Sequence, residues 1–333
     1  MRAVEITVDV TGVAGLAEPL STAATVYLPD ACPTSCPVVF AFPGGGYSRR
    51  YYDLSIGDDS SYSQARHHTD RNMVLVACDH LCTGEATMPA DPFAVSLEQL
   101  AEANAITAGV IVDQLTAGMP ASGLPPLSIS ALVGIGQSMG GCILTVHQAL
   151  SETFDAVAFL GSSGLHTAFP DPSGGTLPIT VPQRGDDLHH ATMPTMFTPE
   201  QFRYCFHYDD VPTEVVDLDM AVGAGVGGED SPAWRSAGAP PCAMTMLSPG
   251  VVAPEAKAIT VPVLVASGQR DVIPNPHAEP AAYPASPDVT MVVVPKMGHM
   301  HNFASTRVRL WDRLARWIDT VVDQRGVAGL ESP

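Results

Sequence analysis

The sequence predicts an α/β fold in which helices cover both faces of a mostly parallel β-sheet. Continuous apolar runs, typical of strands buried on both faces, occur at residues 38–42, 73–78 and 155–160. Stretches with apolar residues at helical spacing separate these runs, at residues 97–116 and 139–153. Such an alternation of strands and helices favours a parallel sheet with helices packed on both sides.

The chain before the first buried strand has a different pattern. Residues 1–30 alternate between apolar and polar side chains, which predicts one or two antiparallel strands at an edge of the sheet. Residues 48–72 are polar and predict a loop with a short helix. We expect the neighbouring His67 and His68 in this stretch to face solvent.

The regular alternation stops after Gly164. Residues 165–258 are rich in proline, glycine, methionine and aromatic residues, with no clean strand pattern and two short predicted helices at 199–207 and 212–221. We interpret this stretch as an insertion that forms a lid over the site. About a third of its large apolar side chains are expected to line a hydrophobic pocket. The candidates are Met193, Met196, Phe197, Phe202, Phe206, Tyr208, Met220, Trp234, Met244 and Met246.

The sheet pattern then resumes and closes the fold. Strand-like runs at 261–266 and 289–294 precede an amphipathic helix at 304–322, with Trp311 and Ile318 on one face. The chain is therefore expected to have three parts, which are a first core part at residues 1–164, a lid at 165–258 and a second core part at 259–333.

The composition excludes several classes of protein. The 333 residues carry a net charge of −19, which disfavours nucleic acids and anionic membranes as partners, since both need clustered lysine and arginine. Neither of the two lysines, Lys257 and Lys296, belongs to a P-loop motif. No apolar run of about 18 residues and no signal core occur, so we expect no membrane span and a cytoplasmic protein.

The cysteines do not indicate a metal site or a disulfide framework. Seven are present, an odd number, and the chain is too long for a disulfide-stapled scaffold. Two C-x3-C pairs occur, at 32–36 and 78–82, but no nearby histidine pair completes a zinc pattern. The dinucleotide fingerprint G-x-G-x-x-G is not matched either. We expect neither a metal nor a cofactor, and the sequence does not indicate an oligomeric state.

The central motif of the chain is the G-x-S-x-G pentapeptide at residues 136–140. It joins the apolar strand run at 128–135 to a predicted helix, and Ser138 stands at its apex. A residue at such a strand-to-helix turn is held in strained backbone geometry, and flanking glycines remove the side chains that would clash. The Ser138 hydroxyl would then be exposed above the sheet. The N–H of Met139 would point to the same side, where an oxyanion forms.

A serine nucleophile needs a base and a carboxylate that orients the base. Because active groups in parallel sheets gather at the carboxyl ends of strands, the candidates are Asp271 after the run at 261–266 and His299 after the run at 289–294. Gly298 lets the chain turn toward the serine, so His299 is favoured over His301, which we place in the pocket wall. The competing acids, Asp209, Asp210 and Asp288, do not follow a strand.

These residues resemble those of the α/β-hydrolase superfamily. The matching stretches are the elbow at 136–140, the glycine loop Phe42-Pro43-Gly44-Gly45-Gly46, the turn at 79–85, and the turns at 268–271 and 298–299. The chain order of serine, acid and histidine is also the one of that fold. The resemblance implies an α/β-hydrolase fold with Ser138 as nucleophile, His299 as base and Asp271 as its partner.

The glycine loop departs from the family in one respect. Pro43 stands where the family often has histidine, and the second backbone donor of the oxyanion hole is then Gly45, ahead of Gly46. Gly46, Tyr47 and His301 are expected to contact the substrate.

The expected activity is hydrolysis of a carboxylic ester or lactone of a hydrophobic small molecule through an acyl-enzyme. Three alternatives use the same fold: an acyltransferase, a carbon–carbon bond hydrolase, and a binding protein without catalysis. A carbon–carbon bond hydrolase needs polar groups in the lid, where Arg184 and Arg203 are the clearest candidates.

Overall fold

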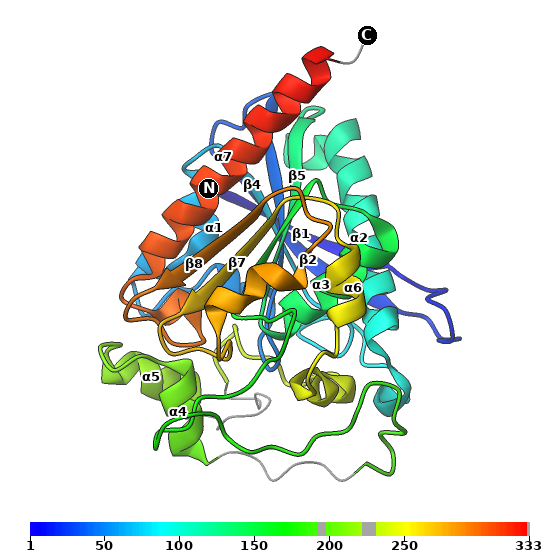
Figure 1. Ribbon diagram of the computed structural model, residues 1–333. Coiled ribbons are helices and arrows are strands. Elements are labelled where there is room, and N and C mark those ends of the chain that lie inside the picture. Colours follow the sequence, from blue (N-terminus) through cyan, green and yellow to red (C-terminus); the bar gives the residue numbers. More distant parts are fainter. Residues whose placement is uncertain (192–197, 222–230, 332–333) are drawn as a thin grey trace.

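A single eight-stranded sheet organises the computed structural model, which describes residues 1–191, 198–221 and 231–331 (Figure 1). The strand order is β1-β2-β4-β3-β5-β6-β7-β8, and β2 pairs antiparallel with both of its neighbours while all other pairs are parallel. This confirms the predicted mostly parallel sheet. The strands are β1 (Arg2–Asp9), β2 (Ser21–Leu28), β3 (Ser35–Phe42), β4 (Val74–Cys78), β5 (Ser128–Gln137), β6 (Ala156–Leu160), β7 (Val263–Gly268) and β8 (Val289–Val294).

The antiparallel edge predicted for residues 1–30 is formed by β1 and β2. They pair along their whole length, from Arg2 opposite Leu28 to Asp9 opposite Ser21. Side chains of β1 are largely exposed, whereas those of β2 from Thr22 onward are buried. Strands β3 to β7 carry the long buried apolar runs that the sequence shows.

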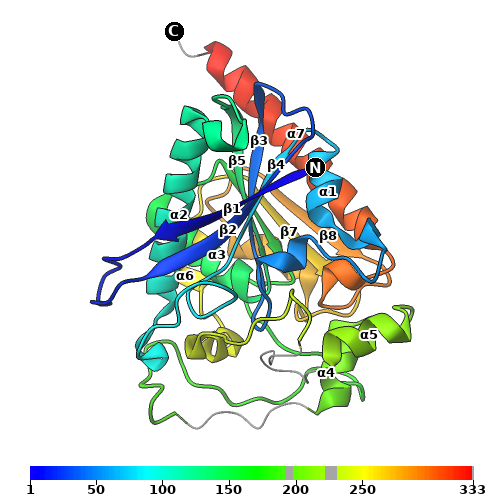
Figure 2. The same cartoon turned by 180° about the vertical axis from the view of Figure 1, so that it is seen from behind.

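Helices cover both faces of the sheet, as predicted (Figures 1 and 2). Helices α1 and α7 lie on one face, and α2, α3 and α6 lie on the other, with a separate hydrophobic cluster beneath each set. The helices are α1 (Gln64–Thr69), α2 (Leu97–Ala117), α3 (Met139–Ser151), α4 (Pro199–Phe206), α5 (Thr213–Met220), α6 (Ala253–Ala258) and α7 (Arg307–Glu331).

Two connections differ from the sequence-based expectation. Helix α7 begins at Arg307 rather than at residue 304, because the chain first makes a 3-10 turn at His301–Phe303. Helix α6 was not predicted, and it packs against α3 on the core. Between β7 and β8 the chain forms a 3-10 turn at Pro276–Ala282, where Pro280 inside the turn is incompatible with a regular α-helix.

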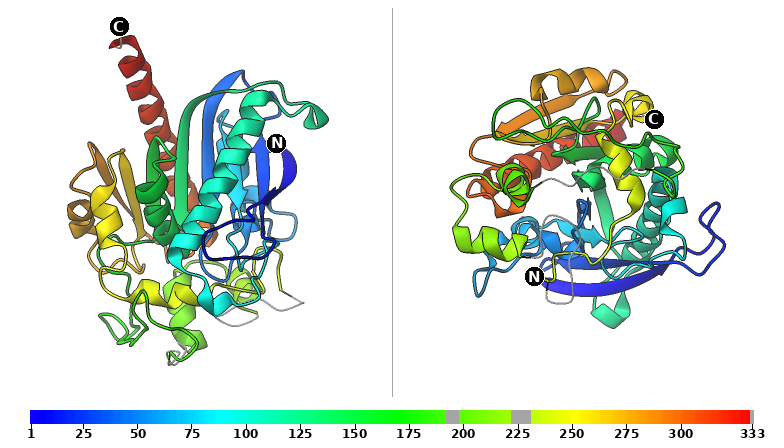
Figure 3. Two further views of the ribbon diagram at one scale, coloured as in Figure 1. Left: turned by 90° about the vertical axis from the view of Figure 1, so that its right-hand side faces the viewer. Right: turned by 90° about the horizontal axis from the view of Figure 1, so that it is seen from below.

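The described residues of the 165–258 stretch add no strand to the sheet. Its helices α4 and α5 lie beyond the ends of the parallel strands, below the sheet in Figure 1, and the right-hand view of Figure 3 looks onto this side. Three of the predicted pocket residues, Met193, Met196 and Phe197, lie outside the described residues. The described part of the chain has no helix that is both long and apolar enough to cross a membrane.

Candidate active site

The backbone at Ser138 has the strained geometry expected of a residue at the apex of a sharp turn. Ser138 joins β5 to α3 with φ 53° and ψ −119°. A Cβ on Gly136 would lie 2.5 Å from the carbonyl oxygen of Gly140, and one on Gly140 would overlap the carbonyl oxygen of Phe42. The two glycines of the motif are therefore required by close backbone contact. The Ser138 N–H donates to Leu160 O on the neighbouring strand (2.8 Å) and fixes the turn to the sheet.

A chain of hydrogen bonds connects Ser138, His299 and Asp271, the three side chains that the sequence pointed to. The Ser138 hydroxyl lies 2.8 Å from Nε2 of His299, and Nδ1 of His299 lies 2.7 Å from Oδ1 of Asp271. An ionised carboxylate can only accept hydrogen bonds, so Nδ1 carries the proton and Nε2 is free to accept one from Ser138. The side chains of His299 and Asp271 are buried.

Asp271 is held by four hydrogen bonds. Oδ1 accepts from His299 and from the N–H of Val272, and Oδ2 accepts from Nε2 of His301 and from the N–H of Gly268, each at 2.7 Å. Burial alone would raise the pKa of Asp271, but the charges and hydrogen bonds of His301 and His299 outweigh it and hold the pKa well below its usual range. Asp271 is therefore a carboxylate at neutral pH.

The structure differs from the expectation for two of the proposed substrate contacts. Neither Tyr47 nor His301 lines the cavity beside Ser138. Tyr47 is 1 % exposed and donates from its hydroxyl to Asp219 (2.7 Å), while His301 is 1 % exposed and donates to Asp271. Both side chains turn into buried polar networks instead. Gly46, the third expected contact, does line the cavity.

Two backbone N–H groups of residues that line the cavity with Ser138 have no hydrogen-bond acceptor among the described residues. They belong to Met139, the first residue of α3, and to Gly45 of the glycine loop. A Cβ on Gly45 would lie 3.6 Å from Sδ and 3.9 Å from Cβ of Met139, so the two residues are in contact range. Unused donors next to a nucleophile are the arrangement that binds a developing oxyanion.

Buried side chains hold the glycine loop in place. Tyr52 donates to Phe42 O (2.8 Å), and Nε2 of His80 donates to Pro43 O (3.1 Å) while its Nδ1 accepts from Asn104 (3.0 Å). His80 thus supports the loop from beneath, consistent with a structural role. Burial lowers the pKa of His80 to about 4, so the imidazole is neutral and one ring nitrogen can accept.

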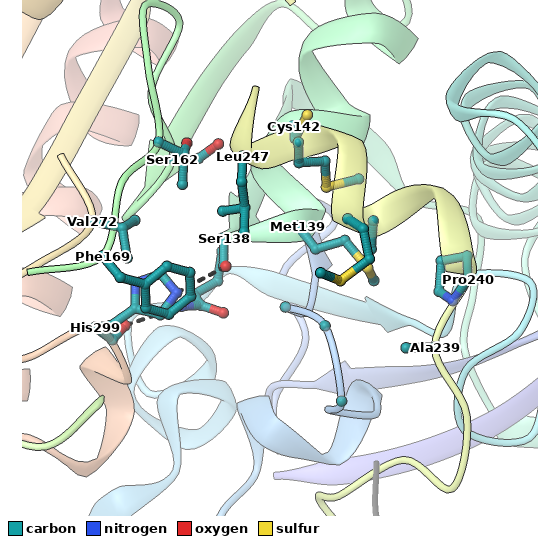
Figure 4. Close-up of a pocket in the computed structure, with 18 of the residues that line it drawn as sticks. Ser138, Met139, Cys142, Ser162, Phe169, Ala239, Pro240, Leu247, Val272 and His299 are labelled. Carbon is teal, nitrogen blue, oxygen red and sulfur yellow. Dashed lines mark hydrogen bonds between the residues drawn. The ribbon is translucent and has the colours of Figure 1, made fainter. Parts of the chain in front are cut away.

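A cavity of about 430 Å³ opens beside Ser138 (Figure 4). Apart from His299, its described lining carries no ionisable acid or base other than the Cys142 thiol, whose pKa burial raises to about 12. Its lining also includes Phe93, Met244, Met246, Leu247 and Met300. On the His299 side, the wall is formed by Phe169 and Val272, with Phe202 and Phe206 packed against Phe169; on the other side it is formed by Met139, Cys142, Ala239 and Pro240. We call these the aromatic arm and the methionine arm.

The aromatic arm surrounds the imidazole. The ring of Phe206 lies 5.5 Å from that of His299 and the ring of Phe169 lies 6.3 Å away, measured between centroids. Phe202 packs edge-on against Phe206. Of the pocket candidates from the 165–258 stretch, Phe202, Phe206, Met244 and Met246 line the cavity, whereas Tyr208, Met220 and Trp234 do not.

A second buried network joins α5 to the glycine loop. Asp219 of α5 is fully buried and accepts from Tyr47 (2.7 Å), His207 (3.0 Å) and the indole N–H of Trp234 (2.9 Å). The guanidinium of Arg235 lies over the Tyr47 ring at 4.4 Å and forms an ion pair with Asp219. Because Tyr47 follows Gly46 directly, this network holds the backbone of the glycine loop. No sequence pattern pointed to Asp219.

Helix α4 is in turn joined to the loop that carries His299. The N–H groups of His299 and Met300 donate to the carbonyl oxygens of Cys205 and Phe206 at the end of α4, each at 2.9 Å. Arg270, the neighbour of Asp271, donates to His207 O (2.7 Å). The 165–258 stretch is thus part of the frame that positions the imidazole.

The competing acids lie elsewhere. Asp209 pairs with Arg270 at the surface, and Asp210 pairs with Lys296. Asp288 has no side-chain hydrogen bond to another described residue and precedes β8. Several cavity residues that sequence reasoning missed, such as Ser162, Phe169 and Phe93, carry no motif and are recognisable only by their position. No group of three or more histidine, cysteine or acidic side chains that could hold a metal ion occurs within the described ranges.

Comparisons with solved structures show the same fold at low sequence identity. An esterase from Thermogutta terrifontis is 15 % identical with a TM-score of 0.58, covering 96 % of this chain and 99 % of the esterase. A bromoperoxidase from Bacillus anthracis is 13 % identical (TM-score 0.58, coverage 96 % and 100 %). A proline iminopeptidase from Mycobacterium smegmatis is also 13 % identical (TM-score 0.58, coverage 98 % and 100 %). These likenesses establish the fold, whereas the activities of the three proteins differ.

A comparison with curated proteins finds no match. A comparison with protein families, in contrast, matches residues 38–312, which run from within β3 through β8 and include all three residues of the hydrogen-bond chain. The matched family agrees with the sheet topology and with the sharp turn at Ser138. The chain therefore belongs to the alpha/beta hydrolase family.

Proposed function

We propose that this protein is a serine hydrolase that cleaves a carboxylic ester or lactone of a hydrophobic small molecule through an acyl-enzyme. The observation that carries the proposal is the hydrogen-bond chain from Ser138 through His299 to Asp271, which ends at an apolar cavity. A serine hydroxyl becomes a nucleophile when a base accepts its proton, and the base needs a group that holds it in the right tautomer.

The reaction follows from the positions of these groups. His299 takes the proton of Ser138 as Oγ attacks the carbonyl carbon, and the N–H groups of Met139 and Gly45 stabilise the oxyanion. When the intermediate collapses, His299 gives that proton to the leaving alcohol, and Ser138 retains the acyl group. Water then attacks the ester with His299 again as base, which releases the acid. Loss of one oxyanion donor typically raises the barrier by about 3 kcal/mol.

The cavity supports an uncharged, apolar substrate. Its volume of about 430 Å³ lies within the range of about 300–1,000 Å³ usual for small-molecule sites. The leaving group must begin beside His299, which protonates it, so the alcohol portion is assigned to the aromatic arm. The acyl chain is assigned to the methionine arm, on the other side of Ser138. We extend the proposal to the 165–258 stretch, which supplies both arms in part and would act as the lid.

The polar groups of the molecule favour this reaction over two rivals. The described cavity lining contains no carboxylate, so the free amino group of a peptide substrate would lack a counter-ion there. The arginines that could position a dioxygenated substrate for carbon–carbon cleavage are engaged elsewhere, Arg184 with Glu98 and Glu255 and Arg203 with Asp217. We also propose a cytoplasmic location, which the seven free thiols support.

Labelling with a fluorophosphonate tests the proposal directly. We expect one adduct per chain, located by mass spectrometry on Ser138, and none in the Ser138→Ala variant. Ser130→Ala is the matched control, because Ser130 lies on the same strand with a buried hydroxyl that has no partner among the described residues. The control should label at the wild-type rate. A reactive residue other than Ser138, or no adduct, would overturn the proposal.

Substrate panels then separate hydrolysis from its rivals. We expect turnover of p-nitrophenyl esters and of lactones, with higher kcat/KM for uncharged acyl chains than for acyl chains ending in a carboxylate. With a competing alcohol present, free acid should remain the main product, because an acyltransferase would instead give mainly the new ester. A protein that takes the label but turns over no ester or lactone would contradict the assignment as a hydrolase.

A further inference from the structure

His301 lies opposite His299 on the same carboxylate. Nε2 of His301 donates to Oδ2 of Asp271 at 2.7 Å, and Nδ1 of His299 donates to Oδ1 at the same distance. With the N–H groups of Gly268 and Val272, each carboxylate oxygen accepts one backbone and one imidazole hydrogen bond. We propose that His301 is a positioning residue for the reaction, which holds Asp271 in the orientation that serves His299 and shares its negative charge.

The surroundings of His301 indicate that its imidazole serves the hydrogen bond to Asp271. The side chain is 1 % exposed and does not line the cavity, so it does not reach substrate. Its other ring nitrogen, Nδ1, is buried and has no partner among the described residues. A buried imidazole with one unpartnered nitrogen is less favourable than an apolar residue of similar size. Among the described residues, the bond to Asp271 is therefore the one hydrogen bond of this side chain.

The backbone that carries His301 is anchored on both sides. The N–H of His301 donates to His299 O (3.1 Å), so the two histidines share one turn. Asn302 receives a hydrogen bond from Trp311 (2.9 Å), donates from its side chain to Tyr51 O (3.1 Å), and donates from its backbone to the Tyr51 hydroxyl (3.0 Å). The backbone that carries His301 is thus fixed independently of Asp271, as a positioning group requires.

The other titratable groups near the carboxylate do not balance its charge. Tyr51 of the 3-10 turn Arg49–Tyr52 and Cys205 of α4 both face Asp271, and burial raises the pKa of each. Both are therefore neutral. Arg270 is committed to Asp209 and to His207 O. Within the part of the chain that is described, His299 and His301 are the side chains that donate hydrogen bonds to this carboxylate.

We expect the loss of His301 to change the pH dependence of the reaction rate. Without His301, Asp271 presents a more concentrated negative charge to His299, which stabilises the imidazolium and moves the acid limb of the rate to higher pH. The carboxylate also gains freedom to rotate, and misplacement of a catalytic group lowers kcat more than it changes KM. A residue that only fills space would affect stability without either effect.

The inference rests on the proposed function, and three variants test it. His301→Leu removes the donor, whereas His301→Gln keeps an N–H donor at about the same reach. His147→Leu is the matched control, because His147 is also fully buried and lies apart from Asp271 on α3. Among the described residues it has one side-chain hydrogen bond, from Nε2 to Thr153 (2.8 Å), and its Nδ1 has no partner. For each variant, the pH profile of fluorophosphonate labelling and of ester turnover is measured together with thermal unfolding.

We expect His301→Leu to lower kcat by about tenfold or more with KM nearly unchanged, and to move the acid limb up by about half a pH unit. His301→Gln should recover most of the rate, and His147→Leu should change the thermal unfolding temperature but not the acid limb of the pH profile.

A rate loss in His301→Leu without a shift of the acid limb, or no rate loss at all, overturns the inference. Should His301→Leu fail to fold, His301→Asn replaces it, because the shorter amide does not reach Oδ2. Absence of labelling at Ser138 in the unmodified protein would overturn the proposed function instead, which separates the two failures.

Discussion

The Oγ atom of Ser138 lies 2.8 Å from Nε2 of His299, although 161 positions of the chain separate the two residues. The contact arises because β5 and β8 run parallel in one sheet, so that the segments following them start at the same edge. The strained turn at Ser138 raises the hydroxyl above this edge, and hydrogen bonds that the loop of His299 donates to carbonyl oxygens of α4 fix the loop opposite it.

The first prediction concerns Asp271. In the Asp271→Asn variant an amide replaces the carboxylate, which removes the charge that stabilises the imidazolium and allows the wrong tautomer of His299. We expect kcat for an activated ester to fall by about 10³- to 10⁴-fold with a small change in KM. Asp288→Asn is the control, and its kinetics should match the unmodified protein. An Asp271→Asn variant with more than a tenth of the normal kcat would remove Asp271 from the mechanism.

The second prediction concerns the glycines of the sharp turn. A Cβ on Gly140 would overlap Phe42 O and lie 2.6 Å from Pro43 O, and both atoms are backbone that cannot move aside cheaply. Gly140→Ala should therefore lower the free energy of unfolding by about 3 kcal/mol or more and abolish labelling of Ser138. The measurement is chemical denaturation alongside fluorophosphonate labelling.

Gly109 supplies the matched comparison for that substitution. It lies in the exposed middle of α2, where a Cβ would meet nothing within 4 Å. Gly109→Ala should stabilise the protein by about 0.5–1 kcal/mol, because alanine is the better helix former. Equal effects at positions 109 and 140 would show that the close backbone contact at Gly140 is not what makes glycine necessary.

The fold and the hydrogen-bond chain could be predicted because their determinants are local. The buried runs of β3 to β7 and the glycines around Ser138 depend on residues within a few positions of one another. The ends of β7 and β8 then indicate where Asp271 and His299 must lie. The roles of individual side chains in catalysis follow from the same positions, and they remain predictions.

Contacts between segments that are far apart in the chain could not be predicted from local sequence patterns. His68 was expected to face solvent, but it is fully buried, donates from Nδ1 to Gln64 O (3.0 Å), and has its pKa lowered to about 3 by burial. The ring of its neighbour His67 packs against Trp311 of α7, more than two hundred residues away. The same applies to Tyr47, whose partner Asp219 lies 172 positions later. Polarity alone does not reveal such partners.

The third prediction concerns this Asp219 network. Burial alone would raise the pKa of Asp219, but hydrogen bonds from His207 and Tyr47 and the charges of His207 and Arg235 hold it below its usual range. Removing one partner of a buried charged network typically costs about 3–5 kcal/mol. We expect Asp219→Asn to destabilise the protein by about 3 kcal/mol at pH 7 and to reduce kcat, since Tyr47 holds the glycine loop.

The sign of the pH dependence provides the check on Asp219. Because the folded-state pKa is depressed, the stabilisation is fully present above the unfolded value of about 3.9 and is lost as the pH falls below it. Urea denaturation of both proteins should show a stability difference that is constant from pH 7 to about pH 5 and shrinks below about pH 4. A difference that grew in acid would contradict the assignment of Asp219 as a buried carboxylate.

The fourth prediction tests which arm of the cavity holds the acyl chain. Ala239 lies in the wall of the methionine arm, away from His299, and a phenyl ring at this position would fill space that a long acyl chain needs (Figure 4). Excluding four methylene groups from an apolar cavity costs about 3 kcal/mol, at about 0.8 kcal/mol each. Ala239→Phe should therefore lower kcat/KM for p-nitrophenyl octanoate by about a hundredfold and leave p-nitrophenyl acetate within about twofold.

Ala237→Phe, two residues earlier at an exposed position outside the lining, is the control and should leave kcat/KM for both substrates unaffected. If Ala239→Phe instead impaired bulky alcohol portions while sparing long acyl chains, the two arms would have to be exchanged, because the leaving group would then occupy the side of Ser138 that faces away from the imidazole.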